Sequence, residues 1–307
     1  MEIRQLECFL ACVRNRSLTL AAEELYMTQP HVSQIIKGLE QELGVQLFHR
    51  KAKGVELTEE GKRIYTYAVN AVKNARTVKD LCADVTPCIR VASNPSSHMA
   101  MLLTDYYRKQ GTSGPVIEYF ECGIEEMLQK IQEGACDLGF LFVPDDRQYA
   151  LKSMLNRRYL EFVPLTKTDL VLYVQKDHPL YGTPRISPKK LLDVKLVQLE
   201  EDFFSLEDML EESEAFRKGH HHLQKTVITN SGHMMIQMLQ NTDLCNIGSY
   251  WLSALYRKYD FGRIRISGYE GRITFGYLKY KNRPLLPHME SFLEFLKAAV
   301  LQDNEQI

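Results

Sequence analysis

Short polar side chains share one face of a predicted helix near the start of the chain. At about 100° per residue, Ser33, Gln34 and Lys37 lie opposite the apolar residues of the same segment, and Pro30 joins them. Hydroxyl and amide groups can hydrogen-bond to the edges of DNA bases, and an ammonium group can pair with a phosphate. The pattern allows two interpretations: the face reads DNA sequence in the major groove, or it is an ordinary solvated helix face.

The apolar residues behind this face predict a small helical unit that holds it in place. In the same helix they form one narrow stripe: Val32, Ile36, Leu39 and Leu43. The helix is expected to begin at Thr28, with Pro30 in its first turn, where a missing N–H costs little. Two shorter helices are predicted before it, one through Leu6, Phe9, Leu10 and Val13, and one through Ala21, Ala22 and Leu25 after the capping residues Ser17 and Thr19.

A basic turn between two short extended segments follows the third helix. Three cations, Arg50, Lys51 and Lys53, lie within four residues before Gly54. Such cations can neutralise the phosphates that flank a groove and supply the salt-dependent part of DNA affinity. The alternative is a solvated charged hairpin.

The order of these motifs resembles that of the LysR-type transcriptional regulators. The resemblance is carried by Ser17-Leu18-Thr19-Leu20-Ala21-Ala22, Leu25, Thr28-Gln29-Pro30-His31-Val32-Ser33, Leu39-Glu40, Leu43-Gly44, Leu47-Phe48-His49-Arg50 and Leu57-Thr58-Glu59-Glu60-Gly61. It is strong over residues 1 to about 65 and consistent in length and layout over the rest. It implies a winged helix-turn-helix with two sets of contacts: base edges for Gln29, Pro30, Ser33 and Gln34, and phosphates for Thr28 and Lys37. His31 and Gly38 depart from the usual family pattern, so the operator sequence cannot be carried over from relatives.

A proline-free segment from Thr58 to about Asp84 predicts one long helix. Its apolar residues alternate spacings of four and three: Ile64, Ala68, Ala71, Ala75, Val78 and Cys82. Such a seam packs against another helix, either in its own domain or in a second copy of the chain. The resemblance implies the second case, a homodimer or homotetramer that places paired recognition helices on one dyad-related DNA site.

After Pro87 the pattern changes to alternating strands and helices. Strands are predicted at residues 88–93, 116–121 and 137–142, with helices at 99–109 and 124–133 between them, a βαβαβ run that implies a parallel sheet. Further strands are expected at 170–175, 195–199, 225–229, 245–247 and 273–280. Further helices are expected at 188–192, 207–218, 234–240 and 289–302.

Two α/β lobes joined near Val163 and Ser267 match the periplasmic-binding-protein architecture that LysR-type effector domains resemble. The predicted fold class is α/β, with a winged helix-turn-helix at residues 1–58, a linker and dimerisation helix at 59–87 and an effector-binding domain at 88–307. Lobe I comprises residues 88–163 and 268–307, and lobe II comprises residues 164–267.

Polar loops follow strand ends in both predicted lobes. Ligands of such folds lie between the lobes, where helix N-termini present N–H groups. Effector contacts are expected from Ser96 and Ser97 in lobe I and from Asn230 and Ser231 in lobe II, although helix capping alone explains these residue types equally well. Glu200-Glu201-Asp202 also follows a strand, and it either is solvated or repels an anionic ligand and binds a basic one.

Composition narrows the function classes. The 307 residues, 45% apolar and 25% charged, suit two or three globular units, and the net charge of -1 means that any basic DNA footprint is local. No signal-peptide pattern or apolar run of about 18 residues occurs, so a cytoplasmic protein with no membrane partner is expected. Seven scattered cysteines without metal-ligand spacing favour reduced structural thiols over redox sensing.

Catalytic motifs are missing from the sequence. His220-His221-His222 favours an exposed turn over a metal site, and no GxSxG, Walker, HExxH or GxGxxG pattern occurs. We therefore expect no catalytic residue, no metal and no cofactor. The main hypothesis is a non-enzymatic regulator that binds promoter DNA, a small-molecule effector and RNA polymerase. The alternative is a solute-binding protein or an enzyme on the same two-lobed fold.

Overall fold

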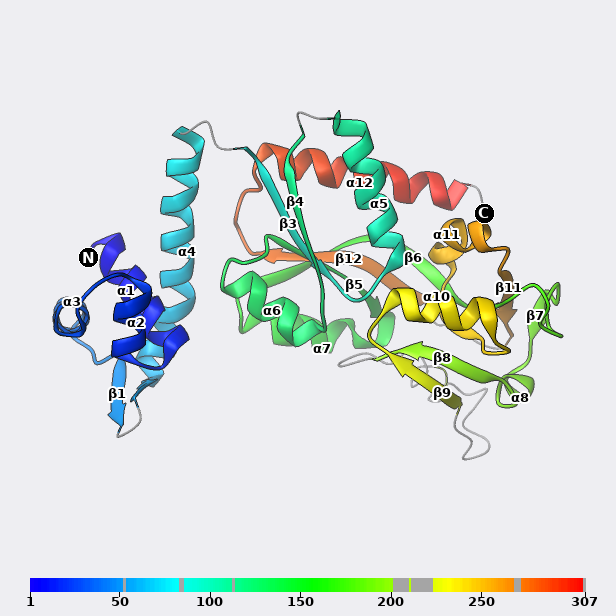
Figure 1. Cartoon of the computed structure of the whole chain (residues 1–307), viewed down its shortest axis with the longest axis horizontal. Helices are drawn as coiled ribbons and strands as arrows, with labels where there is room; N and C mark the ends of the chain where they lie inside the picture. The colour runs from blue at the N-terminus through cyan, green and yellow to red at the C-terminus, as the bar shows by residue number, and fades with distance from the viewer. Residues whose placement is uncertain are drawn as a thin grey trace. The chain divides into compact units, whose positions relative to one another are not determined.

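The computed structural model describes residues 1–51, 54–82, 86–111, 114–200, 210, 223–267 and 272–305 (Figure 1). The chain divides into two compact units, Met1–Thr86 with Gln132–Ala135 and Pro87–Ile131 with Cys136–Ile307. Among the described residues, no helix combines the length and the apolar character that crossing a membrane requires.

Three helices open the N-terminal unit where the sequence predicts them: α1 (Ile3–Asn15), α2 (Leu18–Glu24) and α3 (Gln29–Leu43). Ser17 caps α2, because its Oγ accepts a hydrogen bond from Leu20 N at 3.3 Å. Pro30 lies in the first turn of α3. The same helix ends at Gly44, whose φ of 69° is a left-handed conformation that favours glycine.

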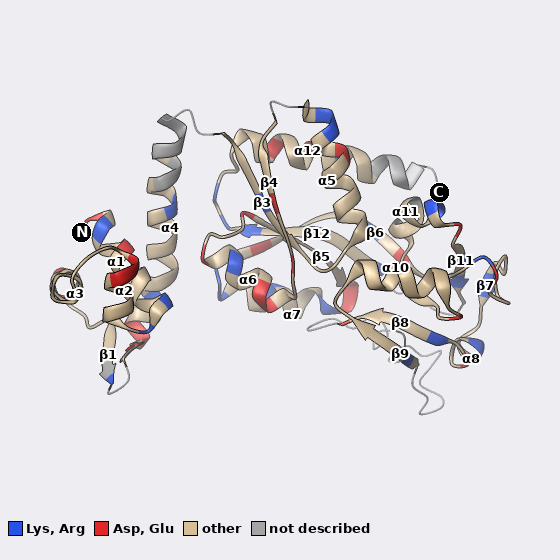
Figure 2. Ribbon diagram, viewed as in Figure 1, with Lys and Arg blue, Asp and Glu red and all other residues tan. Residues whose placement is uncertain are grey.

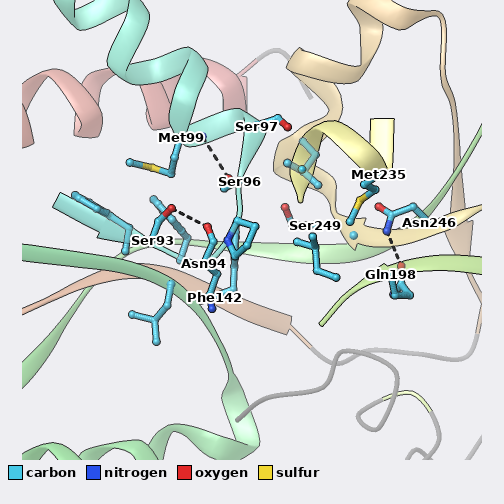
Figure 3. Close-up of a pocket in the computed structure, with 18 of the residues that line it drawn as sticks. Ser93, Asn94, Ser96, Ser97, Met99, Phe142, Gln198, Met235, Asn246 and Ser249 are labelled. Carbon is cyan, nitrogen blue, oxygen red and sulfur yellow. Dashed lines mark hydrogen bonds between the residues drawn. The ribbon is translucent and has the colours of Figure 1, made fainter. Parts of the chain in front are cut away.

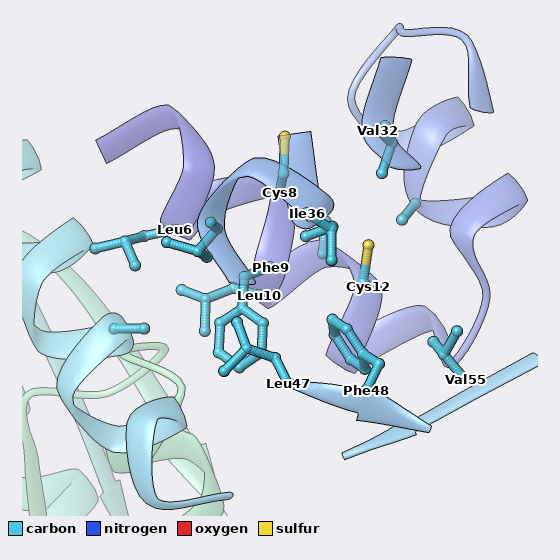
Figure 4. Packing of buried hydrophobic residues seen from close by; sticks show 14 of the residues in the cluster. Leu6, Cys8, Phe9, Leu10, Cys12, Val32, Ile36, Leu47, Phe48 and Val55 are labelled. Carbon is cyan, nitrogen blue, oxygen red and sulfur yellow. The ribbon is translucent and has the colours of Figure 1, made fainter. Parts of the chain in front are cut away.

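The apolar stripe of α3 packs into the core of the N-terminal unit. Val32 and Leu39 are fully buried and Ile36 nearly so, in one cluster with Phe9 (Figure 4). The ring of Phe9 lies 5.3 Å from the ring of Phe48, measured between centroids. Each large apolar side chain removed from water contributes roughly 1.5–3 kcal/mol. Burial of this stripe therefore determines which face of α3 is left to solvent.

A β-hairpin follows, formed by β1 (Phe48–Lys51) and β2 (Gly54–Leu57) in antiparallel pairing. It packs on the turn between α1 and α2, since Val55 N donates to Arg16 O at 3.0 Å. Gly54 has a φ of 132°, and a Cβ there would lie 2.2 Å from the same Arg16 oxygen. The close approach of the two backbones requires glycine at this position.

The long helix α4 (Glu59–Cys82) starts where the hairpin ends. Thr58 joins the two, because its Oγ1 donates to Gln46 O at 2.7 Å and accepts from Gly61 N at 2.9 Å. A Cβ on Gly61 would lie 2.3 Å from Leu47 O. The predicted Leu57–Gly61 motif thus fastens the hairpin to the helix.

The predicted apolar seam of α4 divides between two environments. Ala68 is buried in the core of its own unit together with Val69 and Val72, so this half of the seam is not offered to a second copy. Val78, ten residues after Ala68, is 62% exposed. The side chain of Cys82 lies outside the described residues. The exposed seam position that a second helix could contact therefore lies toward the C-terminal end of α4.

The C-terminal unit begins with the predicted βαβαβ run. Its elements are β3 (Cys88–Ser93), α5 (Ser97–Gln110), β4 (Val116–Glu121), α6 (Ile124–Gln132) and β5 (Leu138–Pro144). The strands lie in the order β4-β3-β5, and β3 is parallel to both neighbours. Next to β5, however, β12 (Arg272–Tyr280) is antiparallel. The predicted parallel sheet is therefore a mixed one.

One long strand, β6 (Leu160–Val174), runs through both lobes. Its first part, from Leu160 to Asp169, pairs with β12. From Leu170 onward it pairs with β10 (Asn246–Ser249) on one edge and β11 (Gly262–Ile266) on the other. The prediction had only the second part of this strand. With β7 (Arg185–Ile186) next to β11, the strands described so far for the C-terminal unit form one eight-stranded sheet.

The remaining elements cover this sheet and complete lobe II. The strands β8 (Lys195–Leu199) and β9 (Gln224–Thr229) form a small parallel sheet next to α10 (Gly232–Asn241). The other helical elements are η2 (Asp145–Arg147), α7 (Gln148–Asn156), α8 (Pro188–Leu191), η3 (Tyr250–Leu252), α11 (Ser253–Tyr256), η4 (Arg257–Tyr259) and α12 (Pro287–Glu305). The helix predicted at residues 207–218 and the triple histidine at 220–222 lie outside the described residues, apart from Leu210.

Candidate functional site

The polar face of α3 lies on the surface of the N-terminal unit. Thr28, Pro30, Gln34 and Lys37 are exposed. Gln29 and Ser33, which belong to the same predicted contact set, are half-buried. The buried stripe on the opposite side anchors the helix, so this face is available to a groove of the width that admits one helix. Base reading by these residues stays a prediction.

The tip of the hairpin carries the predicted phosphate-binding cations. Lys51 is exposed, and its Nζ lies 2.5 Å from Glu56 Oε2 on the neighbouring strand. This hydrogen bond lowers the pKa of the Glu56 carboxyl below its ordinary value. A phosphate would compete with Glu56 for Lys51, and an exposed pair of this kind is weak. The side chain of Arg50 and the whole of Lys53 lie outside the described residues.

Glu40 links α3 to the hairpin, a contact that was not predicted. Its Oε1 accepts hydrogen bonds from Leu47 N at 2.7 Å and from Phe48 N at 3.3 Å. The carboxylate therefore fixes where the chain leaves α3 and enters β1. An acidic residue inside a motif of apolar residues was the signal, because Glu40 directly follows the buried Leu39.

The charge of the N-terminal unit is balanced. Residues 1–58 contain seven Lys and Arg and seven Asp and Glu, so their formal charge is zero. Figure 2 shows basic and acidic residues interspersed on its helices. An attraction to DNA phosphates must therefore come from the positions of a few cations and cannot come from an excess of positive charge.

A cavity of about 140 Å³ lies between the lobes of the C-terminal unit (Figure 3). Its walls come from the loop after β3 and the start of α5 in lobe I, and from β8, β10 and the start of α10 in lobe II. An apolar engineered cavity of about 150 Å³ binds a benzene ring. The volume is therefore suited to a small organic molecule.

The lobe I wall of the cavity is a hydrogen-bonded network. Ser96 Oγ caps α5 by accepting from Met99 N at 3.3 Å. The backbone N–H of Ser96 donates to Glu121 Oε1 at 3.0 Å, and Tyr119 OH donates to the same oxygen at 3.1 Å. Burial raises the pKa of Tyr119, which keeps its hydroxyl protonated. The Glu121 carboxylate thus already occupies a backbone N–H at the start of α5.

The lobe II wall contains two buried amides. Asn246 Nδ2 donates to Val197 O at 3.1 Å and to Gln198 Oε1. Gln198 Oε1 also accepts from Ile247 N at 3.0 Å, and its Nε2 donates to Ile247 O at 3.3 Å. These bonds fix the orientation of both amides. Asn246 and Gln198 were not predicted, although a polar residue within an apolar strand is a signal of such a role.

The predicted effector contacts are distributed unevenly around the cavity. Ser96 and Ser97 line it. Asn230 is exposed, and Ser231 caps α10 by accepting from Met234 N at 3.3 Å, but neither is among the residues that line the cavity. Gly232, from the same turn, does line it. Gly232 of this turn therefore lines the cavity, whereas the Ser231 hydroxyl is bonded within α10.

Two family models match the chain. One, described as a bacterial regulatory helix-turn-helix protein of the lysR family, matches residues 3–62. The other, described as a LysR substrate binding domain, matches residues 115–301, more than half of the chain. The chain belongs to the LysR family. The resemblance stated from the sequence is therefore confirmed.

Relatives of this LysR-family chain are named as transcriptional regulators and not as enzymes. The regulator BenM of Acinetobacter baylyi is 34% identical over 145 residues, 46% of this chain and 47% of BenM. The RuBisCO operon transcriptional regulator of Allochromatium vinosum is 28% identical over 207 residues, 66% of this chain and 65% of that protein. BudR of Klebsiella aerogenes is 51% identical over 65 residues, 21% of this chain and 46% of BudR. The matches to these relatives span from about half to two thirds of their lengths.

Two solved structures share the fold of the chain. A full-length OxyR variant from Pseudomonas aeruginosa has a TM-score of 0.63 at 19% identity and covers 98% of this chain and 94% of its own. The LysR family transcriptional regulator CbnR has a TM-score of 0.50 at 20% identity and covers 96% of this chain and all of its own. The predicted architecture of a helix-turn-helix, a long helix and an α/β effector domain is confirmed at the level of the fold.

Proposed function

We propose that this LysR-family chain is a sequence-specific, DNA-binding transcription regulator whose DNA binding or bending responds to a small molecule in the inter-lobe cavity. The observation that carries the proposal is the face of α3. Its apolar stripe is buried while Gln34 and Lys37 are exposed, within the segment that matches the family's helix-turn-helix model. A helix with this division fits a major groove.

In this proposal, Gln29, Pro30, Ser33 and Gln34 read base edges, and Thr28, Lys37, Arg50, Lys51 and Lys53 hold phosphates. A homodimer or homotetramer presents two such helices to an interrupted inverted repeat. The exposed part of α4 around Val78 supports pairing of this helix with a second copy. The protein acts in the cytoplasm, where promoter DNA and RNA polymerase are found.

The cavity supplies the response to an effector. A ligand changes DNA binding only if it binds one state of the protein better than the other. The walls belong to two lobes, and Ser96 and Ser97 line one side and Gly232 of the α10 turn the other. A ligand that contacts both sides, with Asn230 and Ser231 next to Gly232 as the proposed further contacts, stabilises one spacing of the lobes. This spacing would in turn favour one arrangement of the DNA-reading helices.

Fluorescence anisotropy with DNA tests the proposal. The full chain is titrated with the promoter fragment beside its own gene and with a shuffled fragment of the same composition, at several salt concentrations. We expect at least tenfold tighter binding to the promoter fragment and an affinity that falls steeply with salt. Equal affinity for both fragments, in protein shown to be folded, would contradict sequence-specific binding.

A further inference from the structure

We propose that the cavity selects ligands with a nitrogen-bearing, hydrogen-bond-donating head group, an amine or an amide, and an apolar body, and that it disfavours carboxylates. This inference rests on the proposed role of the cavity as the effector site. It is carried by the charges around the cavity, by the acceptors on its lobe II wall and by one buried hydroxyl group.

Two carboxylates lie at or directly behind the described walls of the cavity. Among the described residues that line it, Glu200 carries the only charge. Glu121 lies directly behind the lobe I wall, on the N–H of Ser96. Each of the helix starts at α5 and α10 is equivalent to about half a positive charge, whereas a carboxylate carries a full negative one. The two carboxylates therefore outweigh the helix starts in formal charge, and an anionic head at the start of α5 would compete with Glu121 for the N–H of Ser96.

The lobe II wall offers a hydrogen-bond acceptor. Both amides are held by their bonds to each other and to the backbone, with Nδ2 of Asn246 directed at Val197 O and Gln198 Oε1. In the described part of the chain, no group donates to Asn246 Oδ1. An N–H of a ligand is the natural partner for this oxygen, whereas a carboxylate has no hydrogen to give.

Ser249 adds a second polar group to the same wall. It lines the cavity (Figure 3), and its Oγ is buried without a hydrogen-bond partner among the described residues. The nearby Ser253 differs, because its Oγ donates to Tyr250 O at 2.5 Å and bonds to Tyr173 OH at 2.9 Å. A buried hydroxyl with no partner is unfavourable. A ligand head that bonds to Ser249 removes this cost.

Large apolar side chains also line the cavity. Phe142, Phe275, Met235, Ile273 and Leu252 line it. Aromatic and thioether side chains accommodate a flat or irregular apolar body. The ligand is therefore polar at one end and apolar at the other.

Isothermal titration of the full chain with benzamide, benzylamine and benzoate tests the head group, because the three probes share one ring. We expect the amide and the amine to bind at least tenfold more tightly than benzoate. Failure of both nitrogen-bearing probes to bind, or binding of benzoate as tight as theirs, overturns the proposal.

Two serine variants locate the head group. Ser249→Ala should weaken benzamide binding five- to tenfold and leave the Tm unchanged or higher, because it removes a hydroxyl that has no partner. Ser253→Ala, the matched control, should lower the Tm and leave benzamide affinity unchanged. Unchanged affinity in Ser249→Ala overturns the assignment of this residue.

The DNA titration separates this proposal from the one on which it rests. If benzoate binds best and also changes DNA affinity, the chain is an effector-responsive regulator and only the head-group assignment fails. If benzamide binds but no promoter fragment does, the ligand chemistry stands and the proposed DNA function fails.

Discussion

Ser97 and Gly232 bring the starts of α5 and α10 together at the cavity. A Cβ placed on Gly232 would lie 2.9 Å from Ser97 Oγ and 3.6 Å from Ser97 N. The two residues belong to different lobes and both line the cavity. A methyl group at position 232 must therefore turn the Ser97 hydroxyl aside or separate the helix starts.

Gly232→Ala is expected to weaken ligand binding with little effect on stability. Loss of one neutral hydrogen bond from Ser97 corresponds to a roughly two- to tenfold lower affinity, and the serine can rotate without strain on the backbone. Titration with benzamide and thermal unfolding measure the two effects. An affinity equal to that of the parent chain would show that the Ser97–Gly232 contact does not shape the site.

Gly38→Ala is expected to stabilise the N-terminal unit by about 0.5–1 kcal/mol, because glycine is unfavourable inside a helix. A Cβ at this position would meet only Gln5 Nε2, at 3.8 Å, an ordinary contact. Chemical denaturation measures the change. Since Gly38 belongs to the N-terminal unit, this variant also serves as the glycine control for Gly232→Ala, and its benzamide affinity should be that of the parent.

Replacement of Ser33 and Gln34 by alanine is expected to relax sequence preference more than it lowers nonspecific DNA binding. Each bidentate base contact provides about 1–3 kcal/mol of discrimination. Replacement of Lys51 and Lys53 should instead weaken all DNA sequences alike and reduce the salt dependence. Anisotropy with promoter and shuffled fragments compares the two double variants. A uniform loss of affinity in both would refute the division between base-reading and phosphate-holding residues.

Glu40→Ala is expected to destabilise the N-terminal unit by about 1.5–3 kcal/mol, because two backbone N–H groups lose a charged acceptor. Glu40→Gln keeps an oxygen in place and should cost less. Chemical denaturation ranks the variants. Both should also lower DNA affinity through a loosened hairpin, and equal stability of all three proteins would exclude Glu40 as the link between α3 and β1.

The C-terminal unit is expected to lose stability in acid through His98. This residue is fully buried against Trp251, with ring centroids 4.0 Å apart, and burial lowers the pKa of His98 to about 4 from its ordinary value of 6.5. Between these two values the unfolded chain binds the proton and the folded chain does not. Stability is therefore complete above about pH 6.5 and declines as the pH falls to about 4, by up to about 3 kcal/mol.

Urea unfolding followed by the fluorescence of Trp251, the only tryptophan of the chain, measures this effect. His98→Phe keeps an apolar ring beside Trp251 and should remove most of the difference between pH 7 and pH 5. The same pH dependence in the variant and the parent would assign the acid sensitivity to other groups.

Local patterns predicted the elements, while contacts between distant segments escaped prediction. The stripe of α3 and the βαβαβ run follow from residue spacing, which a single segment contains. The strand β11 alternates arginine and isoleucine with a period of two, a strand pattern that was not among the predicted elements. The strand β7 has only two residues, too few for any periodicity.

Asn246 meets Gln198 only because β10 and β8 come together, and the two residues are 48 positions apart in sequence. Seam residues of α4 look alike in sequence, and only the packed structure separates the buried Ala68 from the exposed Val78.

The 15 residues of β6 form one unbroken strand that serves both lobes. Its hydrogen bonds to β12 in one lobe and to β10 and β11 in the other leave no loop at this crossing to act as a free hinge. Rotation of one lobe against the other must therefore be taken up as added twist in β6 near Leu170, where its neighbours change. A bound ligand would therefore twist a continuous strand. This twist moves the lobes only a small distance, and it costs free energy when no ligand is bound.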